Sequence, residues 1–297
     1  MTEHVDIIMA TYNGEKFLLE QIQSIQNQEH QKWNLYISDD GSQDNTIQII
    51  KDIQANDQRV KLVNFEKQGG IVENFNKALS FSNAEYIFLA DQDDIWMENR
   101  LQIMLKNFKE IESENLGKSI LMFTDLQLID SNKNIIADSF YKYNKLNPYT
   151  NMRPNMLIWR STVYGCSTLF NKKLLNECFP IPKYASMHDQ WLALKASMND
   201  GLFFFDYTSL KYRQHSNNAI GGVGNGLIGK VRISKRNLNS IKLNVKKIKK
   251  NLTENDFYKS SNLLFPYKVI LFNIFFGEKK LQSLFYFILF IFLGPEK

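Results

Sequence analysis

The sequence contains little cysteine, glycine or proline, and each shortage excludes a class of protein. Its 297 residues include 2 cysteines, Cys166 and Cys178, too few for a disulfide framework, and no Cys/His spacing resembles a zinc site. We therefore expect two thiols in a reducing compartment. The 14 glycines and 6 prolines exclude a collagenous or low-complexity chain. A signal peptide is not expected either, because Glu3 stands where a basic residue is needed and the first apolar run is too short. We therefore expect a chain that is not exported.

Two glycine-rich phosphate-binding motifs are also missing. The pattern G-x-x-x-x-G-K-[ST] does not occur, and no G-x-G-x-x-G follows the first predicted strand. These absences argue against a P-loop ATPase and against a nicotinamide dehydrogenase. A nucleotide diphosphate held through a metal ion, rather than by a glycine loop, fits the sequence better.

The first 125 residues do contain a regular alternation of short apolar runs with helical periodicity. Apolar runs predict strands at residues 5–9, 35–38, 60–65 and 86–90, and the intervening spacings predict helices at residues 17–25, 44–55 and 74–81. Unbroken apolar strands that alternate with helices indicate an α/β fold with a mostly parallel sheet flanked by helices. Because ligands of such sheets bind beyond the carboxyl ends of the strands, the polar residues after each strand are candidate functional residues.

Three polar loops follow the predicted strands, at residues 10–14, 38–46 and 90–96. The third loop contains Asp91, Asp93 and Asp94, three carboxylates that repel each other unless a cation offsets their charge. An Asp-x-Asp pair at a strand end can bind Mg²⁺ or Mn²⁺, which would neutralise a diphosphate leaving group. The alternative for any single loop is that it holds only turn and cap residues.

Taken in order, these loops resemble the motifs of the family 2 glycosyltransferases, whose catalytic domain has the GT-A fold, a Rossmann-like α/β architecture. The resemblance continues in Gly-Cys-Ser at 165–167 and Met-His-Asp-Gln-Trp at 187–191. A last segment, Tyr-Arg-Gln-His-Ser-Asn-Asn at 212–218, is similar to rhamnosyltransferase-like bacterial members. The resemblance implies a GT-A catalytic domain over residues 1–220, followed by an extension over residues 221–297.

The resemblance also implies a nucleotide pocket at the first two loops. Thr11, Tyr12 and Asp40 would line this pocket, with Asp40 reaching the base or ribose. Asp39 lies beside Asp40, and the sequence leaves open which of the two makes the contact. Asp91 would hold the ribose or the water shell of the metal.

The catalytic roles fall, by the same resemblance, on two further aspartates. Asp93 would ligate the metal directly, and Asp189 would act as the general base that deprotonates an attacking sugar hydroxyl. Attack in line with the departing nucleoside diphosphate would invert the configuration of the transferred sugar. His188 precedes Asp189 where many family members have Glu, which leaves the tuning of the base open.

Three further side chains have two interpretations each, and a fourth, Arg213, has one. His215 either completes the metal shell or donates to the diphosphate, as the resemblance suggests, or is a surface or cap residue that follows a predicted strand at 209–212. Arg213 beside it would offset phosphate charge. Trp191 and Trp96 either stack on a sugar ring or pack the floor of a cleft.

Beyond residue 230 the composition changes. Apolar residues recur at spacings of three and four over 238–252, while lysines fill the other faces, which predicts a basic amphipathic helix. Two aromatic-rich apolar stretches follow at 263–276 and 281–293, and both are shorter than the ~20 residues that span a bilayer. We expect a helical extension that associates with an anionic membrane surface in a peripheral or monotopic manner, as a hairpin rather than a span. The alternative is a cap on the catalytic core or an oligomer interface. No nucleic-acid-binding module is recognisable, so no nucleic-acid partner is expected.

The sequence thus predicts an inverting glycosyltransferase at the cytoplasmic face of a bacterial membrane. Its donor would be a nucleoside-diphosphate sugar, either dTDP-rhamnose or a UDP-linked sugar, and its acceptor a lipid-linked saccharide. Two other functions remain as alternatives. One is a nucleotidyltransferase, which would normally have a glycine- and lysine/arginine-rich loop after its first strand. The other is a non-catalytic membrane scaffold, against which the set Asp91, Asp93 and Asp189 argues.

Overall fold

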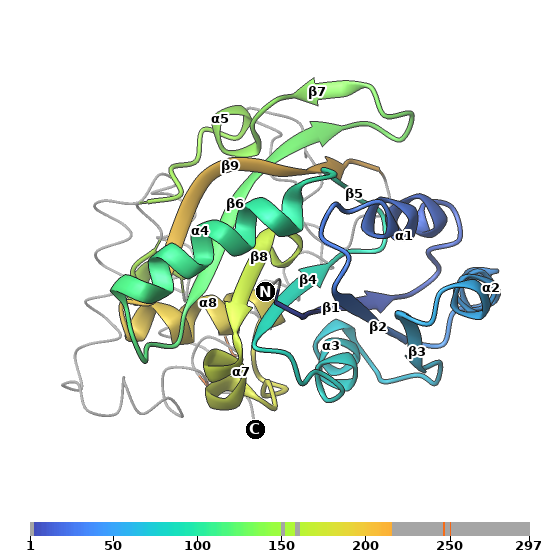
Figure 1. Cartoon of the computed structure of the whole chain (residues 1–297), viewed down its shortest axis with the longest axis horizontal. Helices are drawn as coiled ribbons and strands as arrows, with labels where there is room; N and C mark the ends of the chain where they lie inside the picture. The colour runs from blue at the N-terminus through green and yellow to red at the C-terminus, as the bar shows by residue number, and fades with distance from the viewer. Residues whose placement is uncertain (1–2, 150–151, 158–160, 216–245, 247–249, 251–297) are drawn as a thin grey trace.

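The fold is a mixed β-sheet with helices on both of its faces (Figure 1). The computed structural model describes residues 3–149, 152–157 and 161–215, together with Lys246 and Lys250. The predicted domain boundary at residue 220 and the two apolar stretches lie outside the described residues, and so does the basic helix predicted at 238–252 apart from Lys246 and Lys250. Among the described residues, no helix combines the length and the apolar character that a membrane span requires.

The first half of the chain forms the parallel part of the sheet. Its strands are β1 (Val5–Thr11), β2 (Trp33–Asp39), β3 (Val60–Asn64) and β4 (Tyr86–Ala90), and their order is β3-β2-β1-β4. Three helices alternate with them: α1 (Leu18–Gln26), α2 (Thr46–Asn56) and α3 (Ile71–Leu79). All four strands and all three helices predicted for this region are confirmed.

Burial on both faces of the sheet explains why β1 and β4 are almost continuously apolar. Ile7 of β1 pairs with Leu35 of β2 on one side and with Phe88 of β4 on the other, and all three side chains are fully buried. Helix α3 contacts β1, β2 and α8 (His188–Met198), while α1 contacts α2. In Figure 1, α4 (Arg100–Glu114) lies in front of the sheet and α8 lies behind it.

The second half of the sheet is mixed, which the apolar pattern of the sequence does not predict. Its strands are β5 (Ile95–Trp96), β6 (Leu121–Ile129), β7 (Ile135–Ala137), β8 (Thr168–Asn171) and β9 (Leu202–Arg213). Strand β8 is antiparallel to both β4 and β6, whereas β6 and β9 are parallel. The short helices here are α5 (Phe140–Tyr143), α6 (Pro154–Leu157), α7 (Lys172–Cys178) and a 3₁₀ turn, η1 (Gly165–Ser167).

The pairing of β5 with β9 brings the end of β9 close to the acidic loop between β4 and β5. Strand β5 pairs antiparallel with β9, so that Ile95 lies opposite Lys211. The loop between β4 and β5 contains Asp91, Asp93 and Asp94, and it is therefore held beside the end of β9, where Arg213 and His215 lie. Residues more than a hundred positions apart in the sequence thus meet at one edge of the sheet.

Candidate active site

The loops after β1 and β2 are joined by the buried carboxylate of Asp39. Oδ2 of Asp39 accepts hydrogen bonds from Thr11 Oγ1 at 2.7 Å and from Ser42 Oγ at 2.6 Å, while Oδ1 accepts from the Ser42 main-chain N–H at 2.7 Å. The side chain of Asp39 is fully buried. The carboxylate of Asp39 and the hydroxyl of Thr11 are therefore hydrogen-bonded to each other in the interior of the protein.

Asp40 lies next in the chain but faces a different partner. Its main-chain N–H donates to Thr11 O at 2.9 Å, and its Oδ1 accepts from the main-chain N–H groups of Gln68 and Gly69 at 2.5 and 2.9 Å. The Asp40 side chain is only partly buried. Of the two aspartates between which the sequence left the choice open, Asp40 is the more accessible, and its contact with a nucleotide stays a prediction.

Gln92 connects the first loop to the acidic loop. Its side-chain amide accepts from the main-chain N–H of Tyr12 at 2.9 Å and donates to Tyr12 O at 3.1 Å. A Cβ atom at Gly14 would lie 2.5 Å from Gln92 Oε1, so glycine at this position permits the contact. The ring of Tyr12 is exposed beside this junction, with 55% of its surface accessible.

Two of the three acids in the loop after β4 share a buried cluster with Cys166. Ligand atoms of Asp91, Asp94 and Cys166 lie within 4.8 Å of one another among the described residues. Burial, together with the charges of Asp93 and Asp189, raises the pKa of Asp91 to about 7. Burial and the charges of Asp93 and Asp91 raise the pKa of Asp94 well above its usual value. Asp189 accepts a hydrogen bond from the main-chain N–H of Gly165, the residue before Cys166, so the predicted base lies near the acidic loop.

A buried arginine offsets part of this negative charge. Arg100, the first residue of α4, is fully buried and donates from Nη2 to Cys166 O at 2.5 Å. Its guanidinium carbon lies 4.0 Å from the centroid of the Trp96 ring, and burial lowers its pKa to about 10. The burial of Arg100 was not predicted, because nothing in the neighbouring sequence distinguishes Arg100 from a solvent-exposed basic residue at the start of a helix.

The structure brings the two predicted metal ligands together. His215 Nε2 and Asp93 Oδ2 are hydrogen-bonded to each other at 2.8 Å in this structure, and both side chains retain some exposure, 13% and 17%. Adjacent ligand atoms on an octahedral Mg²⁺ lie about 3 Å apart, because each bond is about 2.1 Å long. The separation therefore fits two neighbouring ligands of one divalent ion. Carboxylate oxygens suit Mg²⁺ and Mn²⁺, and the imidazole adds a nitrogen donor.

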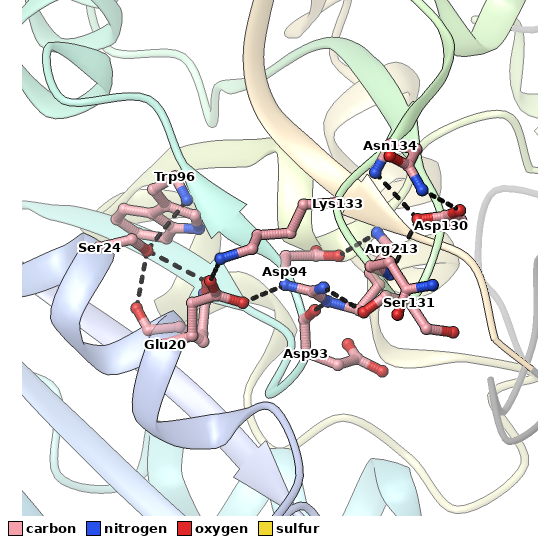
Figure 2. A network of polar contacts seen from close by, with 12 residues as sticks. Glu20, Ser24, Asp93, Asp94, Trp96, Asp130, Ser131, Lys133, Asn134 and Arg213 are labelled. Carbon is pink, nitrogen blue, oxygen red and sulfur yellow. Dashed lines mark hydrogen bonds and ion pairs between the residues drawn. The ribbon is translucent and has the colours of Figure 1, made fainter.

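Arg213 lies two residues before His215 and is almost completely buried. Its Nε donates to Asp93 O at 2.8 Å and its main-chain N–H donates to Asp94 Oδ1 at 3.1 Å (Figure 2). Its Nη2 pairs with Glu20 Oε2 at 2.5 Å. The guanidinium thus contacts the main chain of the acidic loop, and the predicted contact with a donor phosphate stays a prediction.

Asp189 lies in the first turn of α8 and faces η1. Its Oδ2 accepts from the main-chain N–H of Gly165 at 2.9 Å, and its Oδ1 accepts from the N–H of Gln190 at 2.6 Å. A Cβ at Gly165 would lie 2.8 Å from His188 Nε2 and 3.4 Å from Asp189 Cβ. Because glycine has no Cβ, the start of α8 can approach residue 165 closely. The main-chain N–H of Gly165 can then orient the carboxylate of Asp189.

The two tryptophans occupy packed positions. The Trp191 ring is buried, lies edge-on to Tyr184 with ring centroids 5.9 Å apart, and has Lys195 Nζ 4.9 Å from its centroid. Trp96 is buried between Phe88 and Arg100. These contacts match the packing interpretation of both residues. The contact of Trp191 with the donor stays a prediction.

Comparison with known proteins gives the family. The model of the family described as Glycosyl transferase family 2 matches residues 6–192 of this chain. The chain belongs to glycosyltransferase family 2. The matched segment of this glycosyltransferase includes the loops after β1, β2 and β4 and also Asp189, whereas Arg213 and His215 lie beyond it.

Two curated relatives of this family 2 glycosyltransferase match most of its length. A UDP-Glc:alpha-D-GlcNAc-diphosphoundecaprenol beta-1,3-glucosyltransferase, WfgD of Escherichia coli, is 30% identical over 218 residues, which cover 70% of this chain and 76% of the relative. The dTDP-rhamnosyl transferase RfbG of Shigella flexneri is 29% identical over 229 residues, with coverage of 72% and 73%.

A solved structure confirms the GT-A type of fold. The mannosyltransferase PcManGT from Pyrobaculum calidifontis, determined in complex with GDP-Man and Mn²⁺, superposes with a TM-score of 0.59 at 14% identity. The match covers 96% of this chain and 74% of that protein. The α/β fold expected from the sequence is therefore confirmed for the family 2 glycosyltransferase described here.

Proposed function

We propose that this glycosyltransferase is an inverting, metal-dependent enzyme that transfers a sugar from a nucleoside-diphosphate donor to a hydroxyl of a lipid-linked saccharide. The observation that supports this most directly is the arrangement at the carboxyl edge of the sheet. Asp93 and His215 are spaced as neighbouring metal ligands, and Asp189 is hydrogen-bonded to Gly165, next to the Cys166 whose sulfur lies within 4.8 Å of a carboxylate oxygen of Asp91. A metal site and a candidate base thus flank the same acidic loop.

The residues of the chain divide the work of such a transfer. Asp93 and His215 would hold a divalent ion, which supplies positive charge to the diphosphate as it leaves. Asp189 Oδ2 or Oδ1 would accept the proton of the acceptor hydroxyl; each oxygen receives one main-chain hydrogen bond and retains a second lone pair. The acceptor oxygen forms a bond to the anomeric carbon while the bond from that carbon to the phosphate oxygen breaks. The electron pair departs with the nucleoside diphosphate, and the configuration inverts.

The donor and the acceptor follow from the relatives by analogy. WfgD is named for UDP-Glc and for a diphosphoundecaprenol-linked acceptor, and RfbG is named as a dTDP-rhamnosyl transferase. Together with the segment 212–218, these names support dTDP-rhamnose or a UDP-linked hexose as donor and a polysaccharide precursor on a lipid carrier as acceptor. The enzyme would then work at the cytoplasmic face of the membrane, held there by its basic and aromatic extension.

The proposal predicts a strict requirement for Asp93 and Asp189. A panel of nucleotide sugars should be screened for thermal stabilisation with and without Mn²⁺, and the donor that stabilises should be used in transfer assays. Asp189→Asn should lower kcat by about 10²–10⁴-fold, as expected on loss of a general base, while leaving donor stabilisation intact. Asp93→Asn should abolish the metal-dependent part of donor binding.

Asp52→Asn is a matched control, because Asp52 is an exposed aspartate on α2, away from the acidic loop. Normal turnover in Asp189→Asn would show that the base is wrongly assigned. Full activity in the presence of a chelator would exclude the metal. Release of pyrophosphate from a nucleoside triphosphate would favour a nucleotidyltransferase, and a lack of stabilisation by every nucleotide sugar would favour the scaffold.

A further inference from the structure

An ion pair between α1 and the end of β9 lies directly behind the proposed metal ligands. Glu20 Oε2 and Arg213 Nη2 are 2.5 Å apart although the residues are 193 positions apart in the sequence. Arg213 has 1% of its side chain exposed, whereas Glu20 has 34%. Figure 2 shows the Glu20 carboxylate between the guanidinium of Arg213 and the ammonium of Lys133.

Arg213 connects this ion pair to both metal ligands. Its Nε donates to the main-chain oxygen of Asp93 at 2.8 Å, which leaves the Asp93 carboxylate to pair with His215. His215 follows Arg213 by two residues, and both side chains lie against the ring of Phe17. The guanidinium carbon is 4.6 Å and the imidazole centroid 4.9 Å from the centre of that ring. A movement of Arg213 would therefore displace both ligands.

Helix α1 provides a rigid support for this arrangement. Glu20, Ser24 and Gln28 follow one another at intervals of four residues, so they lie on one side of α1 and its continuation. Ser24 Oγ accepts from the main-chain N–H of Trp96 at 3.0 Å, and Gln28 Nε2 donates to Met97 O at 2.7 Å. The same side of the helix therefore holds the segment that follows the acidic loop, while Glu20 holds Arg213.

The turn between β6 and β7 fixes Glu20 and Arg213 from the opposite side. Asp130 accepts hydrogen bonds from Asn132 N and Asn134 N at 2.8 and 2.9 Å, which orders the turn. Ser131 O in this turn accepts from Arg213 Nη1 at 3.3 Å, and Lys133 Nζ pairs with Glu20 Oε1 at 2.8 Å. Partial burial raises the pKa of Glu20, but the hydrogen bonds and charges of Lys133 and Arg213 outweigh it and lower the pKa. Glu20 is thus a carboxylate anion between two cations.

We propose that the Glu20–Arg213 pair is a positioning device that sets the divalent-metal affinity of the site by fixing Asp93 and His215. The inference rests on the proposed function, because it assumes that these two residues ligate the metal. The cation needs the planar fork of arginine, since one side chain must reach Asp93 O, Ser131 O and Glu20 Oε2 in three directions. Partners behind the ligands of a metal site typically alter its affinity by 10–100-fold.

The test measures Mn²⁺ binding to the full-length chain without donor, by the loss of the free-ion signal in electron paramagnetic resonance. Glu20→Gln keeps the shape of the side chain but removes its charge, and we expect the dissociation constant for Mn²⁺ to rise about 10-fold or more. Arg213→Lys should produce a loss of similar size, and the double variant should lose little more than either single variant, because the two residues act as one unit.

Lys133→Met is the matched control. It removes the other ion pair of Glu20, whose lysine is 59% exposed, and Mn²⁺ affinity should stay within about twofold of the wild type because exposed pairs contribute little. Binding of uridine or thymidine without metal provides the second readout. It should be unchanged in Glu20→Gln, whereas general unfolding would weaken it. If Glu20→Gln does not fold, Glu20→Asp, which retains the charge but shortens the side chain, replaces it with the same expected loss.

The outcomes separate this inference from the proposed function. Equal Mn²⁺ affinity in the wild type and Glu20→Gln would overturn the positioning role and leave the metal site standing. A parallel loss of nucleoside binding, or an equal loss of Mn²⁺ affinity in Lys133→Met, would also overturn it. If the wild type binds no Mn²⁺, or if Asp93→Asn and His215→Ala bind it normally, the proposed metal site itself is wrong.

Discussion

The side chain of His188 lies in an apolar environment that is unusual for a polar group. Its imidazole is buried and stacks on Phe75 with ring centroids 3.7 Å apart. Neither ring nitrogen has a hydrogen-bond partner among the described residues. Burial lowers its pKa below the usual value, although the charge of Asp189 partly opposes this effect. A neutral imidazole beside the proposed base adds no charge that would hold a proton away from Asp189.

This burial predicts a pH dependence of stability. Below about pH 6.5 the unfolded chain binds a proton at His188 that the folded chain does not, so folding stability is complete above that pH and decreases below it. The free energy of unfolding should be measured by urea denaturation at pH 8 and pH 5.5. The advantage of the wild type over His188→Asn should narrow toward the lower pH, by at most about 1.4 kcal/mol per pH unit. A constant difference between wild type and His188→Asn would contradict the prediction.

At the scale of elements, Asp39 is the link between β1, β2 and the loop before α2. Its carboxylate accepts from Thr11 and twice from Ser42, and Ser42 Oγ in turn accepts from the main-chain N–H of Asn13 at 2.8 Å. Asp39→Ala would leave buried donors unsatisfied. It should lower the free energy of unfolding by about 3 kcal/mol, as measured from urea midpoints.

Two other substitutions define what this result means. Asp52→Ala on the exposed side of α2 should change stability by less than about 0.5 kcal/mol. Asp40→Ala should weaken nucleotide binding more than it weakens folding, since Asp40 is partly exposed. Equal stability of Asp39→Ala and the wild type would show that the link is dispensable, and the opposite pattern between Asp39 and Asp40 would reverse their assignment.

The elements also show where local patterns are informative. Strands β1 and β4 were predictable because they are buried on both faces of the sheet, which requires an almost continuously apolar sequence. The predicted strand at 209–212 is only the end of β9, which begins at Leu202. The first part of β9 alternates less clearly because Phe203, Phe204 and Phe205 are all only half-buried. The position of the antiparallel strand β8 between β4 and β6 cannot be predicted from its own sequence, because it depends on which strands β8 pairs with.

At the scale of the whole molecule, the basic and aromatic extension can be tested separately from the catalytic region. Removal of residues 257–297 should release the protein from vesicles that contain anionic lipid, since it removes the apolar burial of both aromatic-rich stretches and their flanking lysines, each of which contributes about 1 kcal/mol near such a surface. Metal-dependent donor stabilisation should persist in the shortened chain. Vesicles of zwitterionic lipid serve as the control for charge. Undiminished sedimentation of the shortened chain with anionic vesicles would assign the extension another role.

The sequence by itself determined the α/β class, the order of the first seven elements, and the family to which the acidic loops belong. These features depend on neighbours in the chain: apolar periodicity, strand-end loops and motifs of a few residues. The tertiary structure decided which acids are available. It buries Asp39 and Asp94, leaves Asp40 partly exposed, and places His215 2.8 Å from Asp93. It also gives Glu20 an ion-pair partner and Arg100 a hydrogen-bond partner that the neighbouring sequence does not predict. The physical reason is that burial and ion pairing depend on contacts between distant segments. The contacts of Arg213 and His215 with Glu20 and Asp93, for example, require that β9 pair with β5 and β6.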